Sequence, residues 1–305
     1  MKVGYVALIG RPNVGKSALL NKILGQKVSI ISDKPQTTRI SILGIKTTQK
    51  GQIIFVDNPG IHKPLHKLNK RMMSFVYSAL ETSDLVNLLI DATQKFGHGD
   101  EFVIETLKNI STPIFLLINK VDIVKKEKIL PIIDRYKDLL NFKEIIPISA
   151  LRGTNLDVFE EKIYDNLPEA EKIYSDNEIS DQSQRFLLSE IIREKVLRHV
   201  EQELPFVTAV YIDTIEDVSK NASPYGSSEK KKQKKYIKAN IFVEQESHRR
   251  IIIGKHGHLI KKIGTQARQE LEQILGASVF LDLWVKVKEQ WRDSAEVLDL
   301  IEGQK

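Results

Sequence analysis

The 305-residue sequence contains no cysteine. This excludes disulfide bonds, thiolate metal sites and a cysteine nucleophile, so a reducing compartment such as the cytoplasm suits the chain best. Purely apolar runs are short, as at residues 114–118, and fall far below the roughly 20 residues that a membrane-spanning helix needs. A signal peptide is not indicated either, because Arg11 and Pro12 interrupt the N-terminal apolar stretch. We therefore expect folded structure from the N-terminus of a cytoplasmic protein.

The chain has only a small excess of positive charge overall, but basic residues are concentrated in one segment. The net charge is +6, yet residues 230–262 hold eleven basic residues and two acidic ones, a local net charge of +9. Such a density is expected of a protein that binds a phosphate backbone. The alternative is a solvated, lysine-rich hairpin tip.

The length suggests two domains. In residues 1–170, short apolar runs alternate with helical stretches, the pattern of a doubly wound, mostly parallel α/β sheet. The predicted strands are 5–10, 53–57, 85–91, 114–120 and 145–149, and the predicted helices are 16–24, 68–80, 101–108, 130–140 and 156–166.

The order of elements changes after residues 171–182, a polar segment that we predict to be a linker. A helix over 182–204, ended by Pro205, is followed by strands at 206–213 and 236–244 around a long loop, two helices and a strand at 278–287. This α-β-β-α-α-β order predicts a smaller α+β domain over residues 183–290, with 291–305 as a C-terminal tail.

The octapeptide from residue 10 to residue 17 has the form GxxxxGK[ST], between a predicted strand and a predicted helix. Its glycines allow backbone N–H groups to surround a diphosphate at a helix N-terminus, Lys16 brings a positive charge, and the Ser17 hydroxyl can ligate Mg²⁺. The predicted phosphate-binding residues are Gly10, Arg11, Pro12, Asn13, Val14, Gly15, Lys16 and Ser17.

Two further motifs follow predicted strands and indicate guanine. As a buried acceptor, the Asp122 carboxylate can bind the ring N–H and amino group of guanine, which adenine cannot offer. The backbone at 149–150 can turn an N–H toward the guanine oxygen. The predicted base-binding residues are Asn119, Lys120, Val121, Asp122, Ser149 and Ala150.

A third group of residues predicts a nucleotide-dependent switch. Asp57 can hold Mg²⁺ through water, and the Gly60 N–H is placed to sense the γ-phosphate. In the loop 35–39, Thr38 can complete the Mg²⁺ shell only while that phosphate is present, so hydrolysis would release the loop. The predicted metal ligands are Ser17, Thr38 and Asp57, and Asn58, Pro59, Gly60 and Ile61 complete the predicted nucleotide-binding set.

Together these motifs resemble those of translation-factor-related GTPases. In the second domain, the GxxG tetrad 254–257 lies between apolar helical stretches and among cations. With the element order, it resembles a type II KH domain, a single-stranded RNA binder; a helical hairpin with a glycine turn is the alternative. The RNA-binding candidates are Arg249, Arg250, Gly254, Lys255, His256, Gly257, Lys261 and Lys262.

A GTPase domain followed by a KH domain of this order resembles the bacterial Era family. The resemblance implies GTP hydrolysis with GTP or GDP and Mg²⁺ as ligands. It also implies binding near the end of the small-subunit ribosomal RNA, and a role in its processing and in assembly of the small (30S) ribosomal subunit. We expect a monomer, with peripheral contact to the inner face of the cell membrane as a further property. Asn58 and Ala18 depart from the family, which usually has threonine at both positions.

The hydrolytic machinery is harder to predict. Ile61 occupies the position where many such GTPases place a water-orienting glutamine, and its side chain cannot form a hydrogen bond. Asn13 matches a position that helps hold K⁺ in similar GTPases, so we expect slow hydrolysis accelerated by K⁺ or by a bound partner. The catalytic candidates are Asn13, Lys16, Thr38 and Gly60. The alternatives are a nucleotide-gated RNA-binding or ribosome-binding scaffold with negligible turnover, and a membrane-surface GTPase that uses the lysine cluster.

Overall fold

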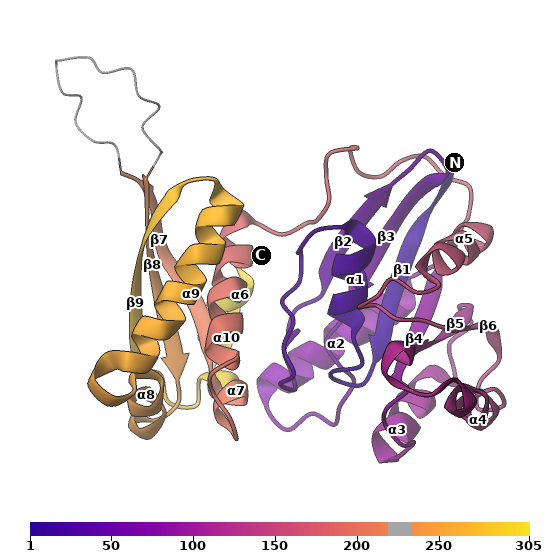
Figure 1. Ribbon diagram of the computed structural model, residues 1–305, viewed down its shortest axis with the longest axis horizontal. Helices are drawn as coiled ribbons and strands as arrows, with labels where there is room; N and C mark the ends of the chain where they lie inside the picture. The colour runs from indigo at the N-terminus through magenta and orange to yellow at the C-terminus, as the bar shows by residue number, and fades with distance from the viewer. Residues whose placement is uncertain (219–233) are drawn as a thin grey trace. The chain divides into compact units, whose positions relative to one another are not determined.

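The computed structural model describes residues 1–218 and 234–305. The chain divides into two compact units, Met1–Gln182 and Ser183–Lys305 (Figure 1). Three lysines of the predicted basic cluster, 230–232, and most of the predicted long loop lie outside the described residues. Among the described residues, no helix has both the length and the apolar character needed to cross a membrane.

The first unit is built on a mostly parallel sheet with the strand order β2-β3-β1-β4-β5-β6, and the predicted fold class is confirmed. Only β2, among the strands of this sheet, runs antiparallel to its neighbour. The strands are β1 (Lys2–Gly10), β2 (Ile42–Thr47), β3 (Gly51–Asp57), β4 (Leu85–Asp91), β5 (Ile114–Asn119) and β6 (Phe142–Pro147). Strand β2 was not predicted, because it lies at an edge and mixes apolar residues with Gly44 and Lys46.

Helices cover both faces of this sheet (Figure 1). They are α1 (Lys16–Leu24), α2 (Lys67–Thr82), α3 (His98–Leu107), α4 (Ile129–Tyr136) and α5 (Leu156–Asn166), with short 3-10 turns η1 (Val121–Ile123) and η2 (Lys126–Lys128). Helices α2, α3 and α4 share one apolar core with alternate residues of β1, β4 and β5. Helices α1 and α5 lie on the opposite face, so the start of α1 is held at the carboxyl end of β1.

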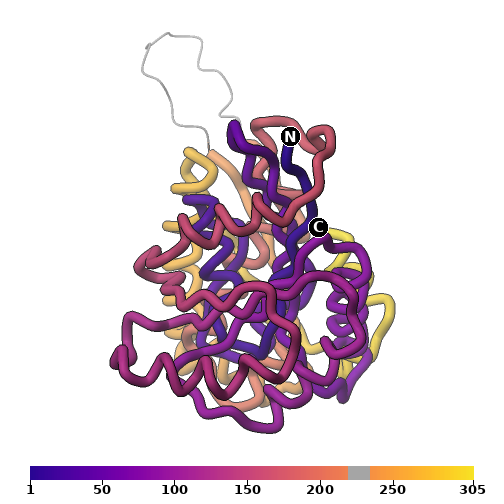
Figure 2. Tube along the Cα trace, turned by 90° about the vertical axis from the view of Figure 1, so that its right-hand side faces the viewer, coloured from indigo at the N-terminus to yellow at the C-terminus, as the bar shows by residue number. Residues whose placement is uncertain are grey.

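The predicted linker 171–182 packs along the first unit, to which it belongs as far as Gln182. Gln52, fully buried in β3, donates to the Tyr174 carbonyl over 2.9 Å and accepts from the backbone N–H of Ile173 and Tyr174. At the β2 edge, the Ile45 N–H donates to the Ile179 carbonyl over 2.8 Å. Residues 168–170, just before, run antiparallel to the N-terminal residues. In Figure 2 the N-terminus lies beside the pink stretch of the chain to which this segment belongs. The segment is ordered because it satisfies polar groups of the sheet that would otherwise lack partners.

In the described part of the second unit, the sheet has the order β7-β8-β9, with β7 and β8 antiparallel and β8 and β9 parallel. Its elements are α6 (Gln184–Leu197), α7 (Leu204–Val207), β7 (Ala209–Asp217), β8 (Lys234–Val243), α8 (Glu246–Ile253), η3 (Lys255–Gly257), α9 (His258–Leu275), β9 (Ser278–Val287), η4 (Trp291–Asp293) and α10 (Ala295–Glu302). Helices α6, α8 and α9 bury their apolar sides against one face of the sheet.

Two expectations for this unit need correction. The helix predicted over 182–204 ends at Leu197, and Pro205 lies in the first turn of α7, where its missing N–H costs no hydrogen bond. Residues 291–305, expected as a tail, pack on the unit. Trp291 is 1% exposed and donates from Nε1 to the Val207 carbonyl over 2.8 Å, while Gln304 hydrogen-bonds the backbone of Ile212 on β7.

Candidate functional site: a nucleotide pocket and a glycine-rich loop

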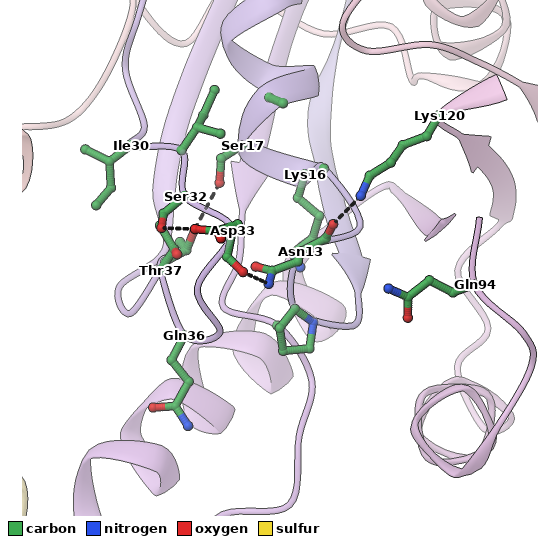
Figure 3. Close-up of a pocket in the computed structure, with 16 residues that line it drawn as sticks. Asn13, Lys16, Ser17, Ile30, Ser32, Asp33, Gln36, Thr37, Gln94 and Lys120 are labelled. Carbon is green, nitrogen blue, oxygen red and sulfur yellow. Dashed lines mark hydrogen bonds between the residues drawn. The ribbon is translucent and has the colours of Figure 1, made fainter. Parts of the chain in front are cut away.

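A cavity of about 460 Å³ opens at the carboxyl ends of the strands of the first unit, beside the N-terminus of α1 (Figure 3). Predicted residues in its lining are Pro12, Asn13, Gly15, Lys16, Ser17, Thr38, Gly60 and Lys120. Ala18, Gln36 and Thr37 also line it, and they are neighbours of predicted residues in the phosphate loop and the loop 35–39. The sequence did not indicate the remaining lining residues: Ile30, Ile31, Ser32, Asp33 and Gln94. Most of these belong to the loop between α1 and β2, whose sequence has no periodic pattern that would have revealed its path.

The predicted phosphate loop surrounds a buried lysine. Lys16 Nζ donates to the carbonyl oxygens of Gly10, at 3.2 Å, and Arg11, at 2.9 Å. Burial lowers the pKa of Lys16 to about 8, although the charge of Asp57 acts in the opposite direction. Gly15 has a φ of 103°, and a Cβ there would lie 2.3 Å from Asn119 Nδ2, so the loop needs glycine at this position.

The predicted metal ligands lie together beside the cavity, with Ser17 and Thr38 in its lining and Asp57 buried behind them. Ser17 Oγ donates to Asp57 Oδ2 over 2.6 Å and lies 2.9 Å from Thr38 Oγ1. Ser29, which no sequence signal identified, also donates to Asp57 Oδ2, over 2.9 Å. We name Ser17, Thr38 and Asp57 the oxygen cluster. It joins the phosphate loop, the loop before β2 and the end of β3.

The environment of Asp57 fits a cation. Its Oδ1 atom is buried and accepts no hydrogen bond from any group in the described residues. A buried acceptor without a donor is uncommon, and Mg²⁺ prefers oxygen ligands of this kind. Burial raises the pKa of Asp57, against the opposing effects of the Ser17 hydrogen bond and the Lys16 charge. The residues of the oxygen cluster are therefore the ones that would hold Mg²⁺.

The predicted base-binding residues form a hydrogen-bonded network beside the cavity. Asn119 donates from Nδ2 to the Val14 carbonyl over 2.8 Å and accepts from the Ala150 N–H over 3.0 Å, which links the phosphate loop to the turn at 149–150. Lys120 Nζ contacts the Asn13 carbonyl at 3.0 Å and Asp91 Oδ2 at 2.6 Å, so Asp91 is a positioning residue that the sequence did not reveal. Burial acts to raise the pKa of Asp91, but hydrogen bonds from Lys120 and Thr93 leave it lowered.

Asp122 differs from expectation in one respect. We predicted a buried carboxylate, but Asp122 is exposed, because η1 carries it on the surface after β5. Its Oδ1 accepts a hydrogen bond from Ser149 Oγ over 2.6 Å, which holds the side chain near the turn at 149–150. Val121 donates its backbone N–H to the Ile148 carbonyl over 3.3 Å.

The segment after β3 abuts the phosphate loop. A Cβ on Gly60 would lie 2.6 Å from the Pro12 nitrogen, and the Ile61 N–H donates to the Gly10 carbonyl over 3.0 Å. The Ile61 side chain is 2% exposed and packs into the core with α2, so it turns away from the cavity. This places only its backbone near the predicted nucleotide site. Asn58 is fully buried and binds Ser41 Oγ at 2.6 Å.

Two other predicted residues direct their side chains away from the centre of the phosphate loop. Asn13 is exposed, has a φ of 64° and donates to the Asp33 carbonyl (Figure 3). Arg11 forms an ion pair with the buried Asp100 of α3 at 2.8 Å. Any contact of Arg11 with phosphate in this arrangement would come from its backbone.

In the second unit, the tetrad 254–257 forms a tight turn between α8 and α9. The φ angles of Gly254, His256 and Gly257 are 72°, 52° and 73°, and the Gly257 N–H donates to the Gly254 carbonyl over 3.1 Å. Lys255 and His256 are exposed at its tip. The remaining predicted cations, Arg249, Arg250, Lys261 and Lys262, are exposed on the flanking helices. A backbone with small residues beside several cations can approach a nucleic-acid strand closely.

Comparisons with known proteins identify the kind of domain that each unit contains. Residues 5–120 match the family model described as a 50S ribosome-binding GTPase, and residues 225–292 match a KH domain model. The chain is 42% identical to Era in its crystal structure with MgGDPNP and nucleotides 1506–1542 of 16S ribosomal RNA, with a TM-score of 0.89 over 99% of this chain and 98% of that one. It is equally similar to a variant of Aquifex aeolicus Era bound to GDP and AlF4⁻, at 42% identity and a TM-score of 0.89 over 99% of each chain. This chain therefore belongs to the Era family of GTPases.

Proposed function

We propose that the chain is a GTP-hydrolysing switch whose KH domain binds single-stranded small-subunit ribosomal RNA during processing and assembly of the 30S subunit. The oxygen cluster carries this proposal. Thr38 belongs to the loop before β2, and its hydroxyl lies 2.9 Å from that of Ser17 in the phosphate loop. Loops of this kind move more readily than the helices and strands that they connect. A contact of this kind can depend on the nucleotide and transmit its state.

At the nucleotide, each group has a defined task. Lys16 and the backbone N–H groups of residues 13–17 bind phosphate oxygens, and Asp122 selects guanine. When bound by the oxygen cluster, Mg²⁺ neutralises charge on the phosphates. The Gly60 N–H supplies a donor near the outer phosphate because this residue packs against Pro12.

Hydrolysis by these groups should be slow, because Ile61 turns its apolar side chain into the core instead of orienting water. We infer that Asn13 would help to hold K⁺, which would neutralise charge that develops between the β- and γ-phosphates. Single-turnover hydrolysis in K⁺ and Na⁺ buffers of equal ionic strength tests this inference, with Asn13→Ala as the matched variant. Equal rates in both salts would remove K⁺ from the mechanism.

RNA binding is assigned to the tetrad 254–257 and its flanking cations. The related Era was crystallised with nucleotides 1506–1542 of 16S ribosomal RNA, so an RNA of that sequence is the appropriate probe. Lys255 and His256 are exposed at the turn, which makes them suitable for substitution without loss of the fold.

The experiment measures fluorescence anisotropy of this labelled RNA with the full chain. Replacing Lys255 and His256 by Asp should weaken RNA binding strongly while the affinity for GTP stays unchanged. A variant with the same substitutions at Lys70 and His98, exposed residues of the first unit, controls for net charge. Unchanged RNA affinity in the first variant would place the RNA site elsewhere.

A further inference from the structure

The sheet of the second unit has an outer face, turned away from α6, α8 and α9, that carries aromatic side chains. On β8 and β9 the residues Ile237, Ala239 and Val279 point into the core, so their neighbours Tyr236 and Phe280 point outward. The rings of these two residues stack with centroids 5.8 Å apart. A second pair, Tyr211 and Phe242, stacks at 6.4 Å.

Two of the aromatic side chains on this outer face are open to solvent. Phe280 is 55% exposed and Trp284 is 53% exposed. Asp282, between them on β9, accepts hydrogen bonds from Trp284 Nε1 over 2.9 Å and Tyr236 Oη over 3.1 Å. The rings are therefore held in place on a rigid strand rather than on a loop, which lowers the entropy cost of stacking a ligand on them.

A cavity of about 230 Å³ lies where this face meets α10. Its lining includes Tyr211, Asn240, Phe242, Lys286 and Lys288. Asn240 is 4% exposed, and its Oδ1 atom accepts no hydrogen bond within the described residues. Because buried polar atoms normally have partners, this carbonyl oxygen indicates a donor supplied by a ligand.

The charges around the face favour an anionic ligand. Lys286 and Lys288 are exposed and form no ion pair with any residue that the structure describes. The acidic residues nearby are mostly engaged, since Asp213 pairs with Lys238 at 3.1 Å and Asp217 pairs with Lys235 at 2.7 Å. Glu296 of α10 is the acidic residue that lines the cavity beside the two lysines.

We propose that this outer face is a second RNA-binding surface. Bases of a single-stranded segment stack on Phe280 and Trp284, Lys286 and Lys288 bind the adjoining phosphates, and a base N–H or amino group donates to Asn240. Aromatic side chains on an exposed sheet, flanked by cations, bind single strands in this way in other folds. The surface is separate from the tetrad 254–257, which lies with α8 and α9 on the core side of the sheet; its assignment to RNA rests on the proposed function.

The fluorescence of Trp284 can report RNA binding at this surface. Of its two tryptophans, Trp284 is 53% exposed and Trp291 is 1% exposed. Base stacking quenches tryptophan emission, so titration of the full chain with the RNA of nucleotides 1506–1542 should quench the wild-type protein. Trp284→Phe, which keeps a ring for stacking, should bind the RNA with similar affinity but lose the quenching.

Fluorescence anisotropy with the same labelled RNA measures how much each aromatic or basic side chain of this face contributes to RNA affinity. Trp284→Ala and Phe280→Ala should each weaken binding about tenfold, the range expected for one stacked base. Ile274→Ala is the matched control, because Ile274 is also an exposed apolar residue of this unit, at 41%. Lys286→Glu with Lys288→Glu should also weaken binding, whereas the same change at Lys70 and Lys143 of the first unit should not.

The outcomes separate this proposal from the proposed function. RNA binding that depends on Lys255 and His256 but leaves Trp284 emission unchanged overturns the second surface and keeps the first. No RNA binding by either measurement overturns both. The same fluorescence measurement is made with vesicles of phosphatidylglycerol and phosphatidylcholine. If Trp284 emission changes with vesicles but not with RNA, the face is a membrane contact and the proposal is overturned.

Discussion

At the scale of single residues, Asp122 is expected to determine the choice of base. In the proposed site, its carboxylate would accept two hydrogen bonds from guanine, whereas Asn would present a donor that matches the extra oxygen of xanthine. Asp122→Asn should therefore lose a few kcal/mol of GTP binding and prefer xanthosine triphosphate. Calorimetric titration with both nucleotides measures the change. Ser149→Ala, which removes the hydroxyl 2.6 Å from Asp122, should keep the guanine preference; an Asp122→Asn variant that still selects GTP would contradict the assignment.

Ile61 allows a second prediction at this scale, about stability and turnover. Because its side chain is 2% exposed in the core, glutamine would place an amide there without hydrogen-bond partners. We expect Ile61→Gln to lower the free energy of unfolding by about 2–4 kcal/mol without faster hydrolysis. Chemical denaturation and single-turnover assays measure both effects, with Ile61→Val, expected to cost about 1 kcal/mol, as the control. A stable variant with faster turnover would show that position 61 can reach the cavity.

The residues of the candidate site divide by how far the sequence could predict them. The motifs indicated Gly15 and Lys16, which line the cavity, and Asn119, which hydrogen-bonds the Val14 carbonyl of the phosphate loop. These residues could be predicted because a glycine-rich turn between a strand and a helix imposes its own local geometry. Ser29 and Asp91 contribute through contacts between distant segments, which leave no local pattern. The exposure of Asp122 was missed for a related reason, since burial depends on what packs above a strand end.

At the scale of elements, the turn between α8 and α9 depends on Gly254. Its φ is 72°, and an added Cβ would lie 2.8 Å from the Leu259 Cβ. Gly254→Ala should displace the turn, cost about 1–2 kcal/mol of stability and weaken RNA binding. Gly264→Ala within α9 is the matched control: its added Cβ would meet only Leu283 Cδ1, at 3.4 Å, so anisotropy and melting should change little. Unaltered RNA affinity in Gly254→Ala would separate the turn from binding.

Strands with buried apolar runs, such as β4 and β5, were predicted closely because such runs rarely arise elsewhere. Elements at the edges of the sheets and at the ends of helices were predicted less well. Strand β2 and the segment 171–182 are fixed by hydrogen bonds to other segments, and α6 ends at Leu197, well before Pro205. The amino-acid composition of these segments did not by itself determine that they would pair with other segments or where the helix would end.

At the scale of the whole molecule, the proposed switch requires that nucleotide and RNA binding influence each other. Thermodynamic linkage makes this influence reciprocal: if GTP changes the affinity for RNA by some factor, RNA changes the affinity for GTP by the same factor. In the proposed switch, Thr38 is the residue through which the loop before β2 would sense the nucleotide, because its hydroxyl lies 2.9 Å from Ser17 Oγ.

We therefore expect RNA affinity to differ between the complexes with GDP and with a non-hydrolysable GTP analogue, by roughly 5-fold to 150-fold. Thr38→Ala should bring the two affinities together while both nucleotides still bind through Lys16 and Asp122. Anisotropy of the labelled RNA in each nucleotide state, combined with nucleotide titrations in its presence and absence, measures both sides of the linkage. Thr37→Ala, at a neighbouring hydroxyl that hydrogen-bonds the Lys34 carbonyl, is the matched control and should leave the difference intact. If wild-type RNA affinity is identical in the two states, the chain binds its ligands independently, and a GTPase that carries RNA without switching would replace the proposed mechanism.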